Sequence, residues 1–360
     1  MKRIGKLVAL AVLAVAAWLL FAPTDVQPVA WAPAKAPAEE GFYAVNRKLA
    51  AVERLGKAGG LNGPDSLVLD AEGRVLTGLA DGRVARMSAD GKTVETLVNT
   101  GGRPLGLAFA PDGKLVVADG LKGLVSFDLA SKKLDVLTTT AAGAKIGFAD
   151  DVKVAADGRV YFSDASRRWG LGQDGEAIME HGGDGRLLRY DPASRATEVL
   201  LDGLQFANGV ALGPDDSYVL VVETGAYRIV RLWLKGEKAG KTEIFADNLP
   251  GFPDNMTFNG RDRFWVAVYA PRNPMIDAVA GHPFVRKMIV RAMQVLPKPV
   301  EHRAMVLGLD LDGKPVVNLQ DDGAGNYSPV THVAEGRDGL WLGSLFGDSV
   351  ARLPLAALKP

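Results

Sequence analysis

Six segments of this chain follow one template, in which a short apolar strand, a tight turn and a second apolar strand recur. The unit repeats at roughly 40–50 residues, which is the period and strand pattern typical of the blades of a β-propeller. We therefore predict an all-β chain folded as a six-bladed β-propeller. The six segments begin at Pro64, Pro104, Ala149, Ala207, Pro253 and Val330.

Four of the six segments carry an acidic or amide side chain at the same template position. Equivalent positions of successive blades converge on the propeller axis, so these side chains should meet in space. Several hard oxygen ligands around one point indicate a bound cation, and Ca²⁺ tolerates loose geometry better than Mg²⁺ does. The alternative is that each side chain caps a local turn through backbone hydrogen bonds. The four candidate metal ligands are Asp65, Asp150, Asn208 and Asp254.

The propeller is expected to occupy residues 46–360. Asp-Gly pairs flanked by alternating apolar residues predict hairpins within the repeats, as at residues 112–113 and 157–158. Asp119, at the end of the second strand of its repeat, is expected on the wall of the axial pocket. The expected blades span residues 62–98, 102–138, 147–200, 204–247, 251–310 and 315–355.

Two repeats contain insertions, at residues 167–183 and 271–300. Apolar residues in the second insertion recur at near-helical spacing, which predicts a short helix. Long loops inside a compact repeat are usually functional. We expect this helical insertion in blade five to form a lid over the axial pocket. It could instead only pack on the propeller face or touch a membrane.

The N-terminus has the organisation of a membrane-targeting segment. Three basic residues lie within the first six, and an unbroken apolar run follows from Leu7 to Ala22. Residues 1–22 are therefore expected to be a retained transmembrane signal anchor, with a cleaved signal peptide and a buried helix as the alternatives. Basic residues before the span place the propeller on the extracytoplasmic side, periplasmic or luminal. Residues 23–45, rich in Pro and Ala, are expected to be a semi-extended tether.

Composition excludes several classes of function. The 42 basic and 42 acidic residues cancel, so no overall field favours nucleic acid or an acidic partner. The chain contains no cysteine, which excludes disulfides, thiolate zinc sites and cysteine nucleophiles. A Gly-x-Ser-x-Gly nucleophile elbow is also missing from the sequence.

Several motifs resemble those of one propeller family. They are Phe206-Ala207-Asn208-Gly209-Val210, Pro250-Gly251-Phe252-Pro253-Asp254-Asn255, Gly185-Arg186-Leu187-Leu188-Arg189-Tyr190 and Leu342-Gly343-Ser344-Leu345-Phe346. Together with the tether, they resemble the strictosidine-synthase-like branch of the gluconolactonase/paraoxonase superfamily. The membrane-anchored subgroup typified by adipocyte plasma-membrane-associated protein is the most similar.

The resemblance implies a Ca²⁺ ion on the axis, held by a Glu of the first blade, two Asn and an Asp. Asn208 and Asp254 match their motifs directly. Asp65 stands where many relatives have Glu, and Asp150 stands where they have Asn. Both departures keep an oxygen ligand but make the site more anionic.

The resemblance further implies a calcium-dependent hydrolase of esters or lactones, in which Asp254 is both metal ligand and general base. His332, near the start of the last repeat, is a candidate proton shuttle, although packing in the core would also explain it. The rival is a non-catalytic extracytoplasmic binding or scaffold protein with a structural ion. Condensation of the strictosidine synthase type is disfavoured, because Glu335 is displaced from the start of the last blade's strand.

Overall fold

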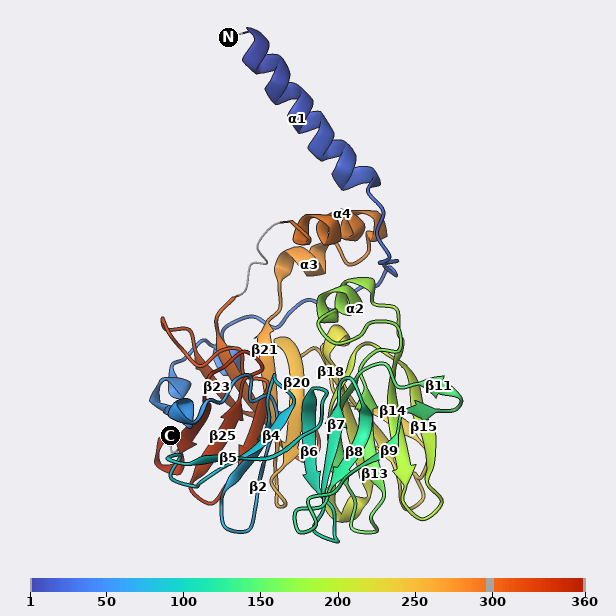
Figure 1. Ribbon diagram of the computed structural model, residues 1–360. Helices are drawn as coiled ribbons and strands as arrows, with labels where there is room; N and C mark the ends of the chain where they lie inside the picture. The colour runs from blue at the N-terminus through green and yellow to red at the C-terminus, as the bar shows by residue number, and fades with distance from the viewer. Residues whose placement is uncertain (1, 296–300, 359–360) are drawn as a thin grey trace.

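The computed structural model describes residues 2–295 and 301–358, and it is a ring of six four-stranded antiparallel sheets (Figure 1). The predicted six-bladed β-propeller is confirmed.

The first four blades each contain four consecutive strands. Blade one has β2 (Leu67–Leu69), β3 (Val75–Gly78), β4 (Arg83–Met87) and β5 (Val94–Asn99), and blade two has β6 (Pro104–Phe109), β7 (Leu115–Asp119), β8 (Gly123–Phe127) and β9 (Leu134–Thr138). Blade three has β12 (Ala149–Val154), β13 (Val160–Asp164), β14 (Gly185–Asp191) and β15 (Ala196–Leu204), and blade four has β16 (Ala207–Leu212), β17 (Tyr218–Glu223), β18 (Arg228–Trp233) and β19 (Thr242–Ala246). A small hairpin of β10 (Thr140–Ala141) and β11 (Ala144–Lys145) separates blades two and three.

The last two blades differ from the predicted division. Blade five contains β20 (Gly251–Phe258), β21 (Phe264–Pro271), β22 (Ala304–Leu309) and β23 (Pro315–Asp321). The predicted start of blade six at residue 315 was therefore wrong, because the long insertion displaces the outer two strands of blade five along the sequence. Blade six has only three C-terminal strands, β24 (His332–Glu335), β25 (Gly339–Gly343) and β26 (Val350–Pro354). Its outer strand is β1 (Glu53–Leu55), which pairs antiparallel with β26 and so closes the ring.

The hydrophobic core lies between neighbouring blades. Alternate residues of a strand point to opposite faces, so consecutive residues of one strand enter two different interfaces. In β21, Phe264 packs in the interface of blades four and five and Trp265 in that of blades five and six. Both faces of each sheet are buried, which is why the middle strands appear in the sequence as unbroken apolar runs.

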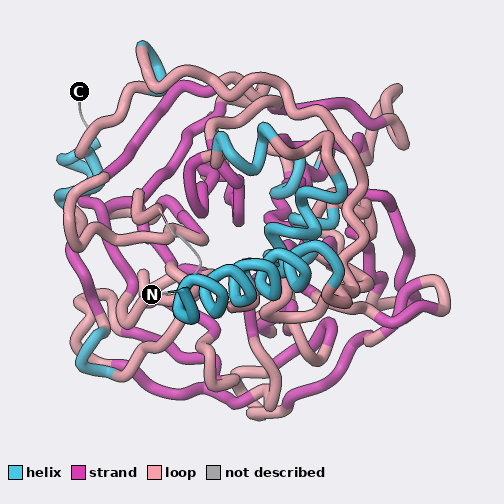
Figure 2. Tube along the Cα trace, turned by 90° about the horizontal axis from the view of Figure 1, so that it is seen from above, coloured by secondary structure: helices cyan, strands magenta, loops and turns pink. Residues whose placement is uncertain are grey.

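All the α-helices in the described residues lie at one end of the ring. The first strand of each blade starts at this end, and the second strand ends there, so the insertions that follow second strands emerge on the same face. They form α2 (Asp174–Glu180), α3 (Pro274–Ala278) and α4 (Pro283–Met293), and we call this end the helical face (Figure 1). Seen from above, the helices cover one side of the ring and part of its centre (Figure 2). The helix predicted in the blade-five insertion is confirmed, while residues 296–300 lie outside the described part.

The N-terminal segment leads onto the helical face. Helix α1 (Lys2–Phe21) is long and apolar enough to cross a membrane, and its apolar stretch is not buried within the protein. The residues after it have no regular structure as far as a 3₁₀ turn at Gly41–Tyr43. They pass over the helical face and hydrogen bond to it, as Val29 does to the carbonyl of Glu180. The segment is thus extended, as predicted, but is held against the propeller.

Candidate functional site

The four predicted ligands lie where the inner strands begin. Asp150 and Asn208 are each the second residue of their strands, and Asp65 comes two residues before β2. The inner strands β2, β6, β12, β16, β20 and β24 pack side by side around the axis. At Gly209 the next strand passes so close that a Cβ atom would lie 2.6 Å from the carbonyl oxygen of Asp254. Tight packing of inner strands is therefore what brings these positions together.

Three of these residues form a buried acidic cluster, which we define as Asp65, Asp150 and Asp254. Burial raises the pKa of all three carboxyl groups. The charges of Asp65 and Asp150 raise the pKa of Asp254 further, and the charge of Asp65 does the same for Asp150. These mutual effects show that the three carboxyl groups are neighbours, although they are far apart in the sequence.

One buried cation partly balances the acidic cluster. Arg103 is 4% exposed, and its charge lowers the pKa of Asp65 and of Asp150. Its guanidinium donates to the carbonyl oxygen of Gly63 at 2.8 Å. When all groups are ionised, three carboxylates and one guanidinium leave a net charge of −2, which is the charge that one divalent cation would neutralise.

Asn208 supplies a further oxygen at the same place. Its amide lies near the carboxyl group of Asp254 and partly offsets the rise in the pKa of that group, while its Oδ1 is buried without a hydrogen-bond partner among the described residues. Buried polar atoms are normally paired, so an unpaired oxygen beside carboxylates suits a hard cation. In residues 2–295 and 301–358, however, no three acidic or histidine side chains converge at the spacing of metal ligands. The donor chemistry fits Ca²⁺, and ligation requires the side chains to move closer together.

Asp151 and Asn255, which directly follow the candidate ligands Asp150 and Asp254, stabilise the ring. Asp151 is fully buried, accepts hydrogen bonds from the backbone of Val152 and Val210, and pairs with Lys153 at 2.8 Å. Asn255 donates its side-chain amide to the carbonyl oxygen of Thr331 at 2.9 Å. Each side chain therefore ties its own inner strand to that of the next blade.

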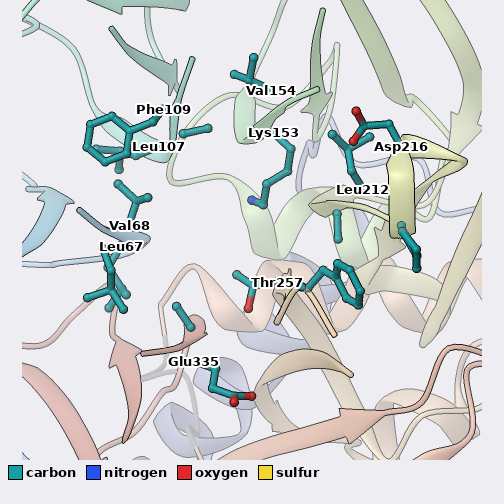
Figure 3. Close-up of a pocket in the computed structure, with 18 of the residues that line it drawn as sticks. Leu67, Val68, Leu107, Phe109, Lys153, Val154, Leu212, Asp216, Thr257 and Glu335 are labelled. Carbon is teal, nitrogen blue, oxygen red and sulfur yellow. The ribbon is translucent and has the colours of Figure 1, made fainter. Parts of the chain in front are cut away.

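His332 is the first residue of β24 and lines an axial cavity whose other lining residues come mainly from the later parts of the inner strands. This cavity has a volume of about 680 Å³, and Lys153 points into it (Figure 3). The ring of His332 is 1% exposed, its Nδ1 has no partner among the described residues, and burial lowers its pKa well below the usual range. A neutral imidazole is therefore maintained there, and its role as proton shuttle stays a prediction.

Asp119 has a structural role, so its expected place on the pocket wall was wrong. Its fully buried carboxylate accepts from the hydroxyl of Thr100 and from the backbone amides of Arg103, Leu121 and Lys122. It thus clamps the loop that leads into β6. The same position of blade three, Asp164, accepts from the amides of Gly147 and Phe148 in the same way.

Two residues of the site could not be predicted from the repeat pattern in the sequence. Arg103 precedes an inner strand whose template position is the apolar Leu105, so only the fold brings its charge to the cluster. Tyr269, near the end of β21, has its pKa raised to about 12 by burial and by the charges of Asp174 and Asp254. It therefore lies beside the cluster on the side of α2.

Comparison with known proteins agrees with this architecture. The strictosidine synthase family matches residues 150–237, and the N-terminal region of strictosidine synthase-like proteins matches residues 41–87. Protein STRICTOSIDINE SYNTHASE-LIKE 6 of Arabidopsis thaliana is 36% identical over 315 residues, which cover 86% of this chain and 83% of the relative. Adipocyte plasma membrane-associated protein of Rattus norvegicus is 35% identical over 367 residues, covering 94% and 95%.

Solved structures share the fold at lower identity. A gluconolactonase of Xanthomonas campestris superposes with a TM-score of 0.63 at 17% identity, covering 92% of this chain and 98% of that one. A calcium-binding protein, regucalcin, of Agrobacterium tumefaciens superposes with a TM-score of 0.57 at 16% identity, covering 80% and 84%. The resemblance seen in the sequence motifs is thus confirmed at the level of family and fold.

Proposed function

This chain belongs to the strictosidine synthase-like family, which includes adipocyte plasma membrane-associated protein, and on that premise we propose that it is a calcium-dependent hydrolase of esters or lactones. Its fold is that of propellers that include a gluconolactonase and a calcium-binding regucalcin. The proposal takes the activity and the cation from these relatives and assigns them to this chain's own axial residues.

The observation that carries the proposal is the acidic cluster beside the unpaired Oδ1 of Asn208. Three buried carboxylates with a single guanidinium destabilise one another unless protons or a cation neutralise them. Asp65, Asp150, Asn208 and Asp254 would hold the Ca²⁺ ion. When bound, the ion would supply Lewis-acid polarisation of the ester or lactone carbonyl.

The chain's own residues carry the remaining chemistry. Asp254 would accept the proton of an attacking water molecule; its carboxylate belongs to the cluster and is shielded from bulk solvent, which supports this role. The side-chain amide of Asn255 donates to Oδ1 of that carboxylate at 3.4 Å and would help to orient it. The helices above the cluster exclude water, because α2 and α4 pack with Phe148 and Phe206 in one apolar cluster.

We also propose that α1 anchors the protein in a membrane, with the propeller on the extracytoplasmic side. The apolar stretch Arg3–Phe21 and the basic residues before it support this topology. The relatives named plasma membrane-associated are consistent with it.

A non-catalytic propeller with a structural ion is the second candidate. The observation that favours it is the position of the axial cavity. That cavity is lined by the distal ends of the inner strands, whereas the cluster lies at their beginnings under the helices. Under this alternative the cation would stabilise the ring, and no substrate would reach Asp254.

The two candidates are separated by hydrolysis assays on the purified full chain with a panel of aryl esters and lactones, with and without chelator. Asp254→Asn keeps an oxygen of similar size but removes the charge and most of the basicity. We expect it to lose about 10²-fold or more in kcat, the usual scale for a general base. The control Asp247→Asn changes an exposed aspartate of blade four and should be unaffected. Hydrolysis that survives in Asp254→Asn would favour the structural ion. A wild type that hydrolyses no substrate of the panel would favour it as well.

A further inference from the structure

Helix α4 buries two arginines and exposes two large apolar side chains. Its arginines Arg286 and Arg291 are 1% and 6% exposed, whereas Phe284 and Val285 are 54% and 38% exposed. Surface helices normally bury their apolar stripe and expose their charges. Phe284 and Val285 therefore form an exposed apolar face of α4, whereas Val290 is buried in the apolar cluster beneath the helix.

The buried arginines explain why α4 is held this way. Arg291 donates from Nε to the carbonyl oxygen of Ala22 at 2.7 Å, and from Nη1 to those of Leu19 and Leu20 at 2.7 and 3.0 Å. The last carbonyls of a helix lack partners within it and carry partial negative charge, so a guanidinium there is stabilising. Arg286 donates to the carbonyl oxygen of Val29 at 2.7 Å. Arg291 thus fixes α4 beside the end of α1, and Arg286 fixes it to the extended segment that follows.

Exposed apolar side chains are concentrated on the helical face as a whole. Leu121, Met275 and Phe346 are 59%, 69% and 70% exposed, and each lies in a loop that follows the second strand of its blade. Large apolar side chains are less exposed at the other end of the ring, where Val316 and Leu355 are 42% and 40% exposed. Polar groups such as Asp70, Glu72 and Arg74 occupy the β2–β3 turn at that end. The helical face is therefore the less polar end of the propeller and suits lipid, whereas the other end suits water.

We propose that the apolar face of α4 lies in the interfacial layer of the bilayer that α1 crosses, and so holds the helical face of the propeller against the lipid. Phe284 and Val285 would be the main contacts. The proposal rests on α1 as a membrane anchor but is independent of hydrolysis. Lipid is the occupant that the geometry favours, because α1 leaves the protein at α4 and rises away from it (Figure 1). A helix of this orientation suits a position in the interfacial plane.

The chain has no cysteine, so a single probe can be placed on the full-length protein. An environment-sensitive fluorophore on Phe284→Cys, in protein reconstituted into phosphatidylcholine–phosphatidylglycerol vesicles, reports on α4. Ala239→Cys, in an exposed turn at the other end of the ring, is the matched control. We expect nitroxide lipids to quench the probe at 284 several-fold more than at 239, with the reverse order for aqueous iodide, as for a side chain ~5–10 Å into the interface.

A second variant separates insertion from mere proximity to the anchor. Adding Val285→Asp to the labelled Phe284→Cys protein should lower lipid quenching and raise iodide quenching, because a charge opposes entry into the interface. Equal iodide quenching at 284 and 239, or lipid quenching that the added Asp leaves unchanged, would overturn the proposal. Shielding of residue 284 that grows with the protein-to-lipid ratio, with self-quenching of the probe, would also overturn it and identify a second copy as the occupant.

Discussion

Removal of one charge from the acidic cluster should change stability in opposite directions with and without calcium. Asp150→Asn keeps the size of the side chain and removes a carboxylate whose pKa is raised by burial and by its acidic neighbours. Without a cation, the variant should unfold at a higher temperature than the wild type, because like charges no longer oppose one another. Relief of about 1–3 kcal/mol is expected for a buried group of this kind.

With calcium the order should reverse. A ligand present at 100 times its Kd stabilises the folded state by about 2.7 kcal/mol. For a propeller of about 300 residues, an unfolding entropy of roughly 0.6 kcal/mol per kelvin converts this into a Tm increase of about 4 °C. The variant leaves a net charge of −1 beside Arg103, so its calcium-dependent increase should be much smaller.

Thermal unfolding of the full chain in detergent, with chelator and then across a calcium titration, measures both effects. Asp247→Asn, which removes an exposed charge outside the cluster, should show the same calcium shift as the wild type. A wild-type Tm that does not respond to millimolar calcium would refute a cation at the cluster. An Asp150→Asn variant that is destabilised in chelator would instead show that the carboxylate has an essential partner within the fold.

Two other predictions concern the segment that crosses the helical face. Arg286→Met removes the hydrogen bonds to the carbonyls of Val29 and Ile178, so hydrogen exchange in residues 23–40 should increase by the equivalent of about 2–4 kcal/mol. The control Lys287→Met loses one bond to the side chain of Gln27 and should have little effect. Equal exchange in both variants would show that Arg286 does not hold the segment in place. Burial lowers the pKa of His181, which stacks on Trp31 at 4.1 Å, from 6.5 to about 3. The unfolded segment takes up the proton first, so the stabilisation is complete above pH 6.5 and is lost as the pH falls, by about 2 kcal/mol at pH 5. The Trp31 fluorescence of His181→Asn should lack this pH dependence, and a wild-type signal that is flat between pH 7 and 5 would contradict it.

The sequence by itself was sufficient to predict the propeller and the candidate ligands. The pattern of short apolar strands is local, and burial of both sheet faces keeps residues such as Val219 to Val222 apolar whatever their partners. Asp65, Asp150, Asn208 and Asp254 share a template position, so the rotational repeat of the blades alone predicts that they converge. The apolar run of α1 is likewise a property of composition and length.

Only the tertiary structure decided how the ring closes and what surrounds the site. Pairing of β1 with β26 joins residues about 300 positions apart in the sequence, and no periodicity in the sequence predicts such a contact. Arg103 brings its charge to the cluster from a turn outside the template. The carboxylate of Asp119 accepts hydrogen bonds from backbone amides that fold back onto it. The orientation of α4 follows from Arg291, which bonds to carbonyls at the end of α1, and from Arg286, which bonds to those of Val29 and Ile178. The periodicity of apolar residues in the sequence shows which face of a strand or helix is apolar, but long-range packing decides what that face contacts.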